Sequence, residues 1–232
     1  QAYSREGAKV FLTYQSERQR LTVEELGAEI GAAKVFACDV TQEADLKQLE
    51  ETLRASVTSL DAVVHSIAFA NRDDLSRPFV ETSREGYLLA QDVSAYSLLG
   101  VARAVRPLMT SGGSIVTLSY LGAVRVVENY NVMGVAKAAL EAIVRYLCSD
   151  LGPSGIRVNA ISAGPVKTAS ARAVKDLSKM LDVFPKMAPL RRNTDPAEVA
   201  DTAVFLASDL GRGVTGNVIY VDAGFQVMGL AH

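Results

Sequence analysis

The stretch Ser114-Ile115-Val116-Thr117-Leu118 is a short apolar run that lies between two long helical patterns. Successive apolar positions are typical of a strand that is covered on both faces. The helical patterns cover residues 84–109 and 130–151, and Arg157-Val158-Asn159-Ala160-Ile161 follows as the next strand. This order predicts parallel strands that are joined by helical crossovers.

The same alternation extends in both directions along the chain. Residues 4–7 are typical of a last helical turn that ends at Gly7, before an apolar run that reaches Tyr14. We predict further helices at 21–30, 42–56 and from Asp195-Pro196 onward, and further strands at 34–38, 60–66 and 217–221. Residues 164–193 are the least regular, with Pro185 and Pro189 as interruptions, and are expected to form a substrate flap. We therefore expect one doubly wound α/β domain over residues 1–232.

Composition limits the possible functions. The chain has 232 residues, a formal net charge of −2 and 49% hydrophobic residues, which excludes disordered, collagen-like and coiled-coil classes. Without a basic footprint or a long apolar segment, we expect neither nucleic-acid binding nor a membrane span. Cys38 and Cys148 are expected to be small buried residues of a cytoplasmic protein, and no signal peptide is recognisable.

Polar residues collect where the predicted strands end, at the edge where parallel sheets bind ligands. Tyr130 and Lys137 are seven residues apart on one predicted helix and therefore lie on nearly the same face. We expect the lysine ammonium to lower the Tyr130 pKa and to make the hydroxyl a better proton donor. His65 and His232 are not expected to be catalytic, and metal-ligand spacing is absent from the sequence.

The segment Tyr130-Asn131-Val132-Met133-Gly134-Val135-Ala136-Lys137 resembles the catalytic helix of the short-chain dehydrogenase/reductase superfamily. Met133 stands where most of that superfamily has its tyrosine, and Tyr-x6-Lys is the variant of the enoyl-[acyl-carrier-protein] reductases. Their second tyrosine matches Tyr120. The motifs that carry the resemblance are Leu118-Ser119-Tyr120-Leu121-Gly122, His65-Ser66-Ile67-Ala68-Phe69-Ala70, Val93-Ser94-Ala95-Tyr96-Ser97, Ser162-Ala163-Gly164-Pro165, Pro189-Leu190-Arg191-Arg192 and Asp222-Ala223-Gly224-Phe225.

This resemblance implies a Rossmann-type fold and the NADH-dependent reduction of trans-2-enoyl thioesters on acyl-carrier protein, in type II fatty-acid synthesis. Tyr130 would hydrogen-bond the thioester oxygen, Lys137 would hold the nicotinamide ribose, and Tyr120 would act in catalysis or simply wall the pocket. The implied substrate contacts are Ala70, Tyr120 and Tyr130. The implied cofactor contacts are Gln15, Asp39, Val40, Ser66, Ile67, Lys137, Val166, Lys167, Thr168, Ala169 and Ser170.

The neutral Gln15 stands where an acid would mark NAD and basic residues would bind a 2′-phosphate. Resemblance favours NADH, while Arg18 keeps NADPH as an alternative. Lys175 and Lys179 match a docking patch for acyl-carrier protein, although Ser178 between them departs from the family pattern and a solvated helix face is the plainer explanation. The resemblance also implies a homotetramer built on the helices at 84–109 and 130–151.

The opening strand and glycine-rich turn of a dinucleotide fold are not in this sequence. Gln1 to Gly7 match the end of the helix that follows that turn. We expect the full protein to carry them, which leaves import into an organelle open, and we expect the strands at 10–14 and 62–66 to flank the place of the lost central strand. A product without the segment should fold poorly and bind NADH weakly. Two alternatives remain: another short-chain reductase that acts on a ketone, or a non-catalytic remnant that keeps only oligomer contacts.

Overall fold

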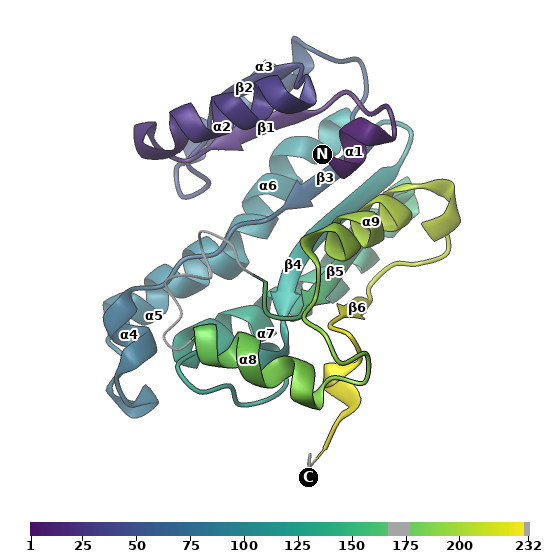
Figure 1. The fold of residues 1–232 in the computed structure, drawn as a ribbon. Coiled ribbons are helices and arrows are strands. Elements are labelled where there is room, and N and C mark those ends of the chain that lie inside the picture. The colour runs from purple at the N-terminus through teal and green to yellow at the C-terminus, as the bar shows by residue number, and fades with distance from the viewer. Residues whose placement is uncertain (167–176, 230–232) are drawn as a thin grey trace.

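The computed structural model describes residues 1–166 and 177–229 (Figure 1). Strands and helices alternate, and every strand pair is parallel, which confirms the predicted α/β class. The strands are β1 (Phe11–Tyr14), β2 (Lys34–Ala37), β3 (Ala62–His65), β4 (Gly113–Tyr120), β5 (Ile156–Ala163) and β6 (Val218–Val221). The predicted strands at 114–118 and 157–161 are each extended, because β4 and β5 pair along their whole length.

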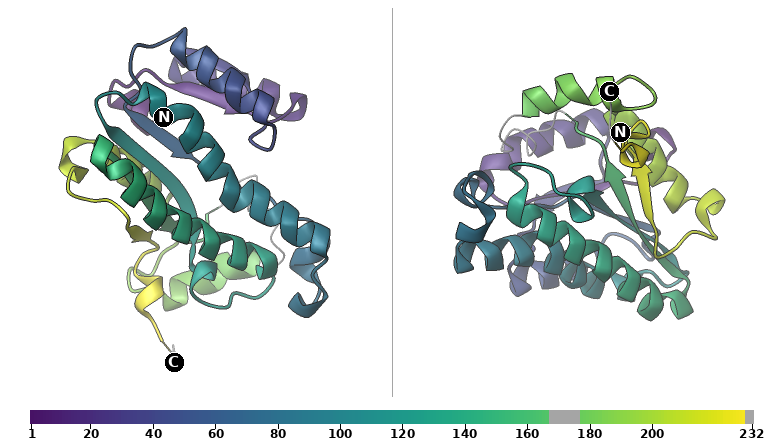
Figure 2. Two further views of the ribbon diagram at one scale, coloured as in Figure 1. Left: turned by 180° about the vertical axis from the view of Figure 1, so that it is seen from behind. Right: turned by 90° about the horizontal axis from the view of Figure 1, so that it is seen from below.

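The helices are α1 (Ala2–Arg5), α2 (Glu17–Ile30), α3 (Glu43–Arg54), α4 (Arg72–Ser76), α5 (Arg84–Gln91), α6 (Ser97–Val105), α7 (Asn131–Leu151), α8 (Leu177–Met187) and α9 (Pro196–Ala207). Helix α9 covers one face of the sheet, and α6 and α7 cover the other (Figures 1 and 2). Gly7 follows α1 with φ 83°, and Asp195 caps α9, both as predicted.

Two predicted segments differ in kind from the structure, and α2 also begins at Glu17, before the helix predicted at 21–30. The pattern at 84–109 is not one α-helix, because a π-helical turn, Asp92–Tyr96, separates α5 from α6. The flap at 164–193 is more regular than expected, because α8 forms with Pro185 inside it. Proline removes the backbone donor that would bond the carbonyl four residues earlier. Here the Asn193 Nδ2 donates to the Leu181 carbonyl oxygen at 3.0 Å, so that carbonyl keeps a partner.

The strands form two separate sheets. β1 pairs with β2, and β3-β4-β5-β6 form the second sheet in that order. In the part of the chain that the structure describes, no strand bridges β1 and β3, which confirms the break predicted between them. Val64 of β3 is 44% exposed, although a valine in a parallel strand is normally covered. Among the strands that the structure describes, β1 pairs only with β2, and β3 pairs only with β4.

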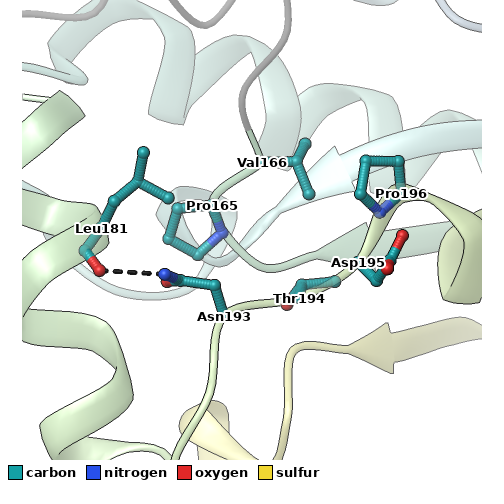
Figure 3. A pocket seen from close by; sticks show the side chains of 7 residues that line it. All are labelled: Pro165, Val166, Leu181, Asn193, Thr194, Asp195 and Pro196. Atoms are coloured by element: carbon teal, nitrogen blue, oxygen red, sulfur yellow. Dashed lines mark hydrogen bonds between the residues drawn. The ribbon is translucent and has the colours of Figure 1, made fainter.

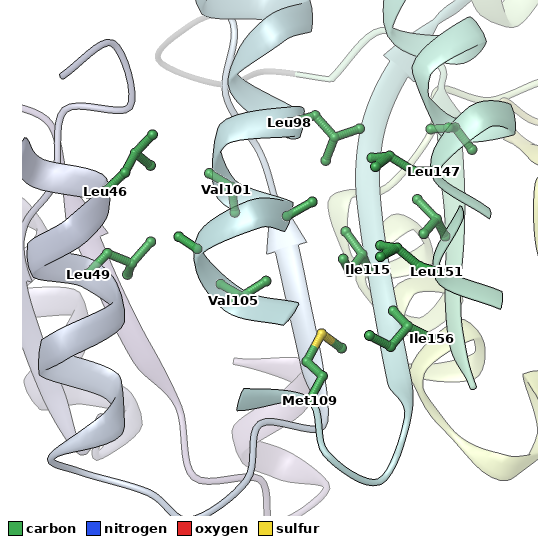
Figure 4. Close-up of a cluster of buried hydrophobic side chains, with 14 of the residues drawn as sticks. Leu46, Leu49, Leu98, Val101, Val105, Met109, Ile115, Leu147, Leu151 and Ile156 are labelled. Carbon is green, nitrogen blue, oxygen red and sulfur yellow. The ribbon is translucent and has the colours of Figure 1, made fainter. Parts of the chain in front are cut away.

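Helix packing joins the two sheets. Leu46 and Leu49 of α3 lie against α6, whose Val101 and Val105 continue the cluster toward β4 and α7 (Figure 4). Gly100 allows α3 and α6 to approach closely. A Cβ atom at this position would lie only 2.8 Å from the Leu46 Cδ1. This core holds the first 60 residues against the rest of the protein without help from β1–β3 hydrogen bonds.

Candidate active site

Two tyrosines meet where β4 ends and α7 begins. Tyr120 is the last residue of β4, and Tyr130 is the residue directly before α7. Their ring centroids lie 4.8 Å apart with an interplanar angle of 62°, an edge-to-face arrangement. A Cβ atom at Gly122 would lie 2.4 Å from the Tyr130 Cδ1, so the ring packs directly on the backbone of the β4–α7 connection. The structure therefore brings the two predicted tyrosines together.

Lys137 lies two turns into α7 and is only 5% exposed. Its Nζ donates to the Leu118 carbonyl oxygen at 2.6 Å, so the ammonium is fixed at the same end of β4 as Tyr120. Burial lowers the Lys137 pKa to about 8, since a charged group loses solvation there, while the charge of Glu141 partly opposes this shift.

The expected lowering of the Tyr130 pKa is wrong. Burial raises that pKa far above 10, and the neighbouring Tyr120 raises it further. Burial also raises the pKa of Tyr120, to about 12. Desolvation outweighs any help from Lys137, because the phenolate would have to form in a largely apolar setting. Tyr130 is thus held as a neutral phenol at ordinary pH.

The motifs at the ends of β3 and of α5 meet at the π-helical turn. The backbone N–H of Phe69 donates to the Ser94 Oγ at 2.9 Å, and that hydroxyl lies 3.0 Å from the Phe69 carbonyl oxygen. His65 is 2% exposed, with its Nδ1 2.9 Å from the Thr117 Oγ1 and its Nε2 2.8 Å from the Ser97 Oγ. Burial lowers the His65 pKa to about 3. The histidine is a structural tie between strand and helix, as its non-catalytic reading predicts, but the sequence did not indicate its partners.

The predicted adenosine side of the site lies at the ends of β1 and β2. The Gln15 Nε2 donates to the Asp39 Oδ2 at 3.2 Å, while the Asp39 Oδ1 accepts from the Thr41 N–H and hydroxyl. Asp39 therefore has a turn-forming role and also faces Gln15. Val40 packs against the core. Directly after β3, Ser66 is exposed and Ile67 is partly buried.

A hollow of about 330 Å³ lies between the end of β5, α8 and the start of α9 (Figure 3). Its lining is Pro165, Val166, Leu181, Asn193, Thr194, Asp195 and Pro196. The Thr194 Oγ1 and Asn193 Oδ1 are buried there without a hydrogen-bond partner among the described residues. Val166, an expected cofactor contact, thus lines a hollow with polar groups that a ligand could satisfy. Lys167, Thr168, Ala169 and Ser170 lie outside the described residues.

A second hollow, of about 470 Å³, lies beside Tyr130. Its largely apolar lining comes from Phe79, the residues from Gly122 to Val127, and Tyr130, Asn131, Gly134, Val135 and Ala138. Sequence reasoning missed this surface, although the run Val124-Arg125-Val126-Val127 was a signal for it. Ala70 and Tyr130 pack against the same small cluster of Leu75, Ala90, Val132 and Met133. The predicted substrate contacts are therefore close together, next to an apolar hollow.

The other predictions have mixed outcomes. Cys38 is buried, and burial raises its thiol pKa to about 11, but Cys148 is only partly buried. Lys179 lies on α8, whereas Lys175 and His232 lie outside the described residues. Over residues 1–166 and 177–229, no three His, Cys, Asp or Glu side chains gather as metal ligands would. None of the helices described is both long and apolar enough to cross a bilayer.

Comparison with known proteins connects this geometry to a family. The family described as "Enoyl-(Acyl carrier protein) reductase" matches residues 1–226. The chain is 55% identical over 225 residues to the NADH enoyl-[acyl-carrier-protein] reductase FabI of Bacillus cereus, covering 96% of this chain and 88% of the relative. It is 50% identical over 224 residues to the NADPH enoyl-[acyl-carrier-protein] reductase FabI of Staphylococcus aureus MRSA252, a match that covers 96% of this chain and 88% of the relative.

Solved structures agree. The Bacillus cereus enoyl-acyl carrier protein reductase with NADP+ and indole naphthyridinone has a TM-score of 0.97 and 54% identity, over 99% of this chain and 90% of that one. The Anaplasma phagocytophilum reductase in complex with NAD has a TM-score of 0.93 and 44% sequence identity, and the match covers 99% of this chain and 85% of that one. The geometry of Tyr120, Tyr130 and the buried Lys137 agrees with these matches. This chain belongs to the enoyl-[acyl-carrier-protein] reductase family of the short-chain dehydrogenase/reductase superfamily.

Proposed function

We propose that this protein reduces the double bond of trans-2-enoyl thioesters on acyl-carrier protein, with NADH as reductant, in the last reductive step of type II fatty-acid elongation. The observation that carries the proposal is the pair Tyr120 and Tyr130, whose ring centroids are 4.8 Å apart. Tyr130 lines an apolar hollow, and the buried Lys137 lies on α7, the helix that begins directly after Tyr130. We place the reaction in the cytoplasm, because the relatives that match are bacterial enzymes of this activity.

The chain's residues fit a nicotinamide dinucleotide. Lys137 spends one of its three ammonium hydrogens on the Leu118 carbonyl, which leaves two for the ribose hydroxyls. Gln15 and Asp39 offer polar groups at the ends of β1 and β2, where a dinucleotide crosses such a sheet. The remaining proposed contacts are Val40, Ser66, Ile67, Val166 and, outside the described residues, Lys167, Thr168, Ala169 and Ser170. When bound, the reduced nicotinamide supplies a hydride to the β-carbon of the enoyl thioester.

Tyr130 donates a hydrogen bond to the thioester oxygen as that oxygen gains enolate charge. Its raised pKa keeps the phenol neutral at ordinary pH, so the hydroxyl carries the hydrogen with which it donates this bond. A donor that is fixed before the reaction stabilises developing charge without the cost of reorganising solvent. Tyr120 holds the Tyr130 ring by edge contact, and Ala70 lies at the substrate side. A proton from solvent, added at the α-carbon, completes the reduction.

The assay that tests the function follows NADH oxidation with a short trans-2-enoyl thioester and, separately, with a 3-ketoacyl thioester. Consumption with the enoyl substrate alone supports the proposal. Consumption with the ketoacyl substrate alone would favour the ketone-reductase alternative, which Tyr-x6-Lys argues against. Turnover of neither, by a protein that remains folded, would favour the non-catalytic remnant.

Cofactor choice is tested in the same assay with NADH and NADPH. Relatives at similar identity bear either cofactor in their names, so the neutral Gln15 and the nearby Arg18 decide the expectation here. We expect NADH to be preferred, and Arg18→Ala to lower any NADPH activity more than NADH activity. Arg20→Ala is the matched control, because Arg20 is already paired with Glu24 and Glu17.

Two partners complete the proposal. Acyl-carrier protein would dock through Lys175 and Lys179 of the flap, and a salt-dependent KM for the carrier-bound substrate would support this. A homotetramer would bury side chains that α5 and α7 leave exposed, such as Leu88 at 58% and Tyr146 at 76% exposure. Sedimentation velocity measures the assembly directly.

A further inference from the structure

Glu141 is a buried carboxyl group for which the reaction outlined above has no use. It lies on α7 and is only 6% exposed, although glutamate is rarely buried without a partner. Its Oε1 accepts a hydrogen bond from the Ser119 Oγ at 2.5 Å, and Ser119 is itself 6% exposed. A carboxyl group in this setting needs an explanation, because burial is costly to its charged form.

Glu141 and Lys137 hold successive residues of β4. Lys137 donates to the Leu118 carbonyl, and Glu141 one helical turn later accepts from Ser119. Both contacts fix the strand immediately before Tyr120. Side chains four residues apart lie on the same side of a helix, so the carboxyl and ammonium groups lie one turn apart on α7 and contact adjacent residues of β4, without a direct ion pair between them.

Charges around the pair make Glu141 the natural partner of Lys137. Of the described side chains, only Glu141 raises the Lys137 pKa by its charge, against the lowering caused by burial. His65, on β3, also faces Lys137, but its low pKa of about 3 keeps it neutral.

Glu141 is itself influenced from several sides. Burial raises its pKa, while the Ser119 hydrogen bond, Arg145 and Lys137 favour the carboxylate. From β6, Tyr220 feels the Glu141 charge, which contributes to raising the tyrosine pKa. Because Arg145 is exposed and lies one turn further along α7, Ser119 is the buried hydrogen-bond partner of the carboxyl group and Lys137 is the buried positive charge that influences it.

We propose that Glu141 is a positioning residue, whose carboxylate, held by Ser119, is the buried counter-ion of Lys137 one helical turn away at the end of β4. The inference rests on the proposed function for its consequence in turnover, but the charge relation itself is a property of the folded protein. Removing the carboxylate removes the group that favours the ammonium. Lys137 should then lose its proton at lower pH.

The direct test is an NMR titration of protein labelled with ¹³C at the lysine ε-carbons, with the Lys137 signal assigned by its loss in Lys137→Met. Glu141→Gln keeps an oxygen that can accept from Ser119 but removes the charge. We expect it to lower the titration midpoint of Lys137 by about one pH unit or more. Glu141→Asp should recover part of the shift, and Glu25→Gln, an exposed acid on α2, should cause none.

The same variants are then compared by kcat/KM with the enoyl thioester across pH. The ratio of Glu141→Gln to wild-type activity should fall as pH rises, because the variant loses its ammonium first. A pH-independent loss would show a merely structural role and overturn the proposal, as would an unchanged Lys137 midpoint. If Glu141→Gln does not fold, Ser119→Ala should shift the midpoint in the same direction by a smaller amount, and no shift there would also overturn it.

The two readouts separate this inference from the proposed function. Wild-type protein that fails to reduce the enoyl thioester would contradict the function, while the NMR midpoints would still decide the role of Glu141. Conversely, the proposed function would stand and the counter-ion role of Glu141 would be rejected if wild type is active and the Lys137 titration midpoint is the same in wild type and Glu141→Gln.

Discussion

Tyr120 and Tyr130 lie edge to face, 4.8 Å between ring centroids, although ten residues separate them in the sequence. The turn between β4 and α7 brings them together, and Gly122 lets the Tyr130 ring rest on the backbone. The contact orients the Tyr130 hydroxyl, and burial keeps that hydroxyl protonated. These features make Tyr130 the first residue to test.

Tyr130→Phe should lower kcat by about 10²-fold or more while NADH affinity stays nearly the same, because the hydroxyl matters mainly as enolate charge develops. Steady-state kinetics and NADH fluorescence titration measure the two effects. Tyr120→Phe is the matched variant: it keeps the ring contact, so a loss below tenfold is expected. Unchanged turnover in Tyr130→Phe would remove that residue from the mechanism.

Lys137→Ala should weaken NADH binding as well as turnover, since the ammonium is the proposed donor to the ribose and also bonds the Leu118 carbonyl. Lys137→Met fills similar space without charge and separates lost packing from lost donors. Both variants should show a raised Kd for NADH in a fluorescence titration. A normal Kd in the methionine variant would contradict a cofactor-holding role.

Asn193 should stabilise α8 by replacing the donor that Pro185 removes. Asn193→Ala leaves the Leu181 carbonyl unpaired and should cost about 1–3 kcal/mol in the free energy of unfolding, measured with urea. In a Pro185→Ala background the backbone N–H is restored, so the same Asn193 change should cost less. Equal costs in both backgrounds would show that the two residues act independently.

Glu198 should make stability depend on pH in the acid range. The Arg192 hydrogen bonds lower its pKa from 4.5 to about 2 in the folded protein, with help from the Asp195 backbone N–H. A lowered folded-state pKa gives stability that is present above about pH 4.5 and is lost as pH falls toward 2. The Tm difference between wild type and Glu198→Gln should therefore shrink over this interval. Because the pair is exposed, the difference should be small. Glu25→Gln should show no such trend.

The sequence by itself determined the alternation of strands and helices, the residues at the strand ends and the separation of Tyr130 from Lys137. These follow from local periodicity and from short motifs, which neighbouring residues carry on their own. The resemblance to the family, rather than the sequence alone, predicted that β1 and β3 do not pair with one another, because in the superfamily's order another strand lies between them.

Tertiary structure decided what depends on environment. Burial reversed the expected direction of the Tyr130 pKa, and no local pattern reports the desolvation of a phenol. Ser94, in the π-helical turn after Gln91, accepts a hydrogen bond from Phe69, 25 residues earlier in the chain. Asn193 donates to the Leu181 carbonyl of α8, 12 residues earlier. Local sequence patterns do not report such contacts. The sequence did not indicate the role of Glu141 for the same reason, because its hydrogen-bond partner Ser119 is brought to it only by the packing of α7 on β4.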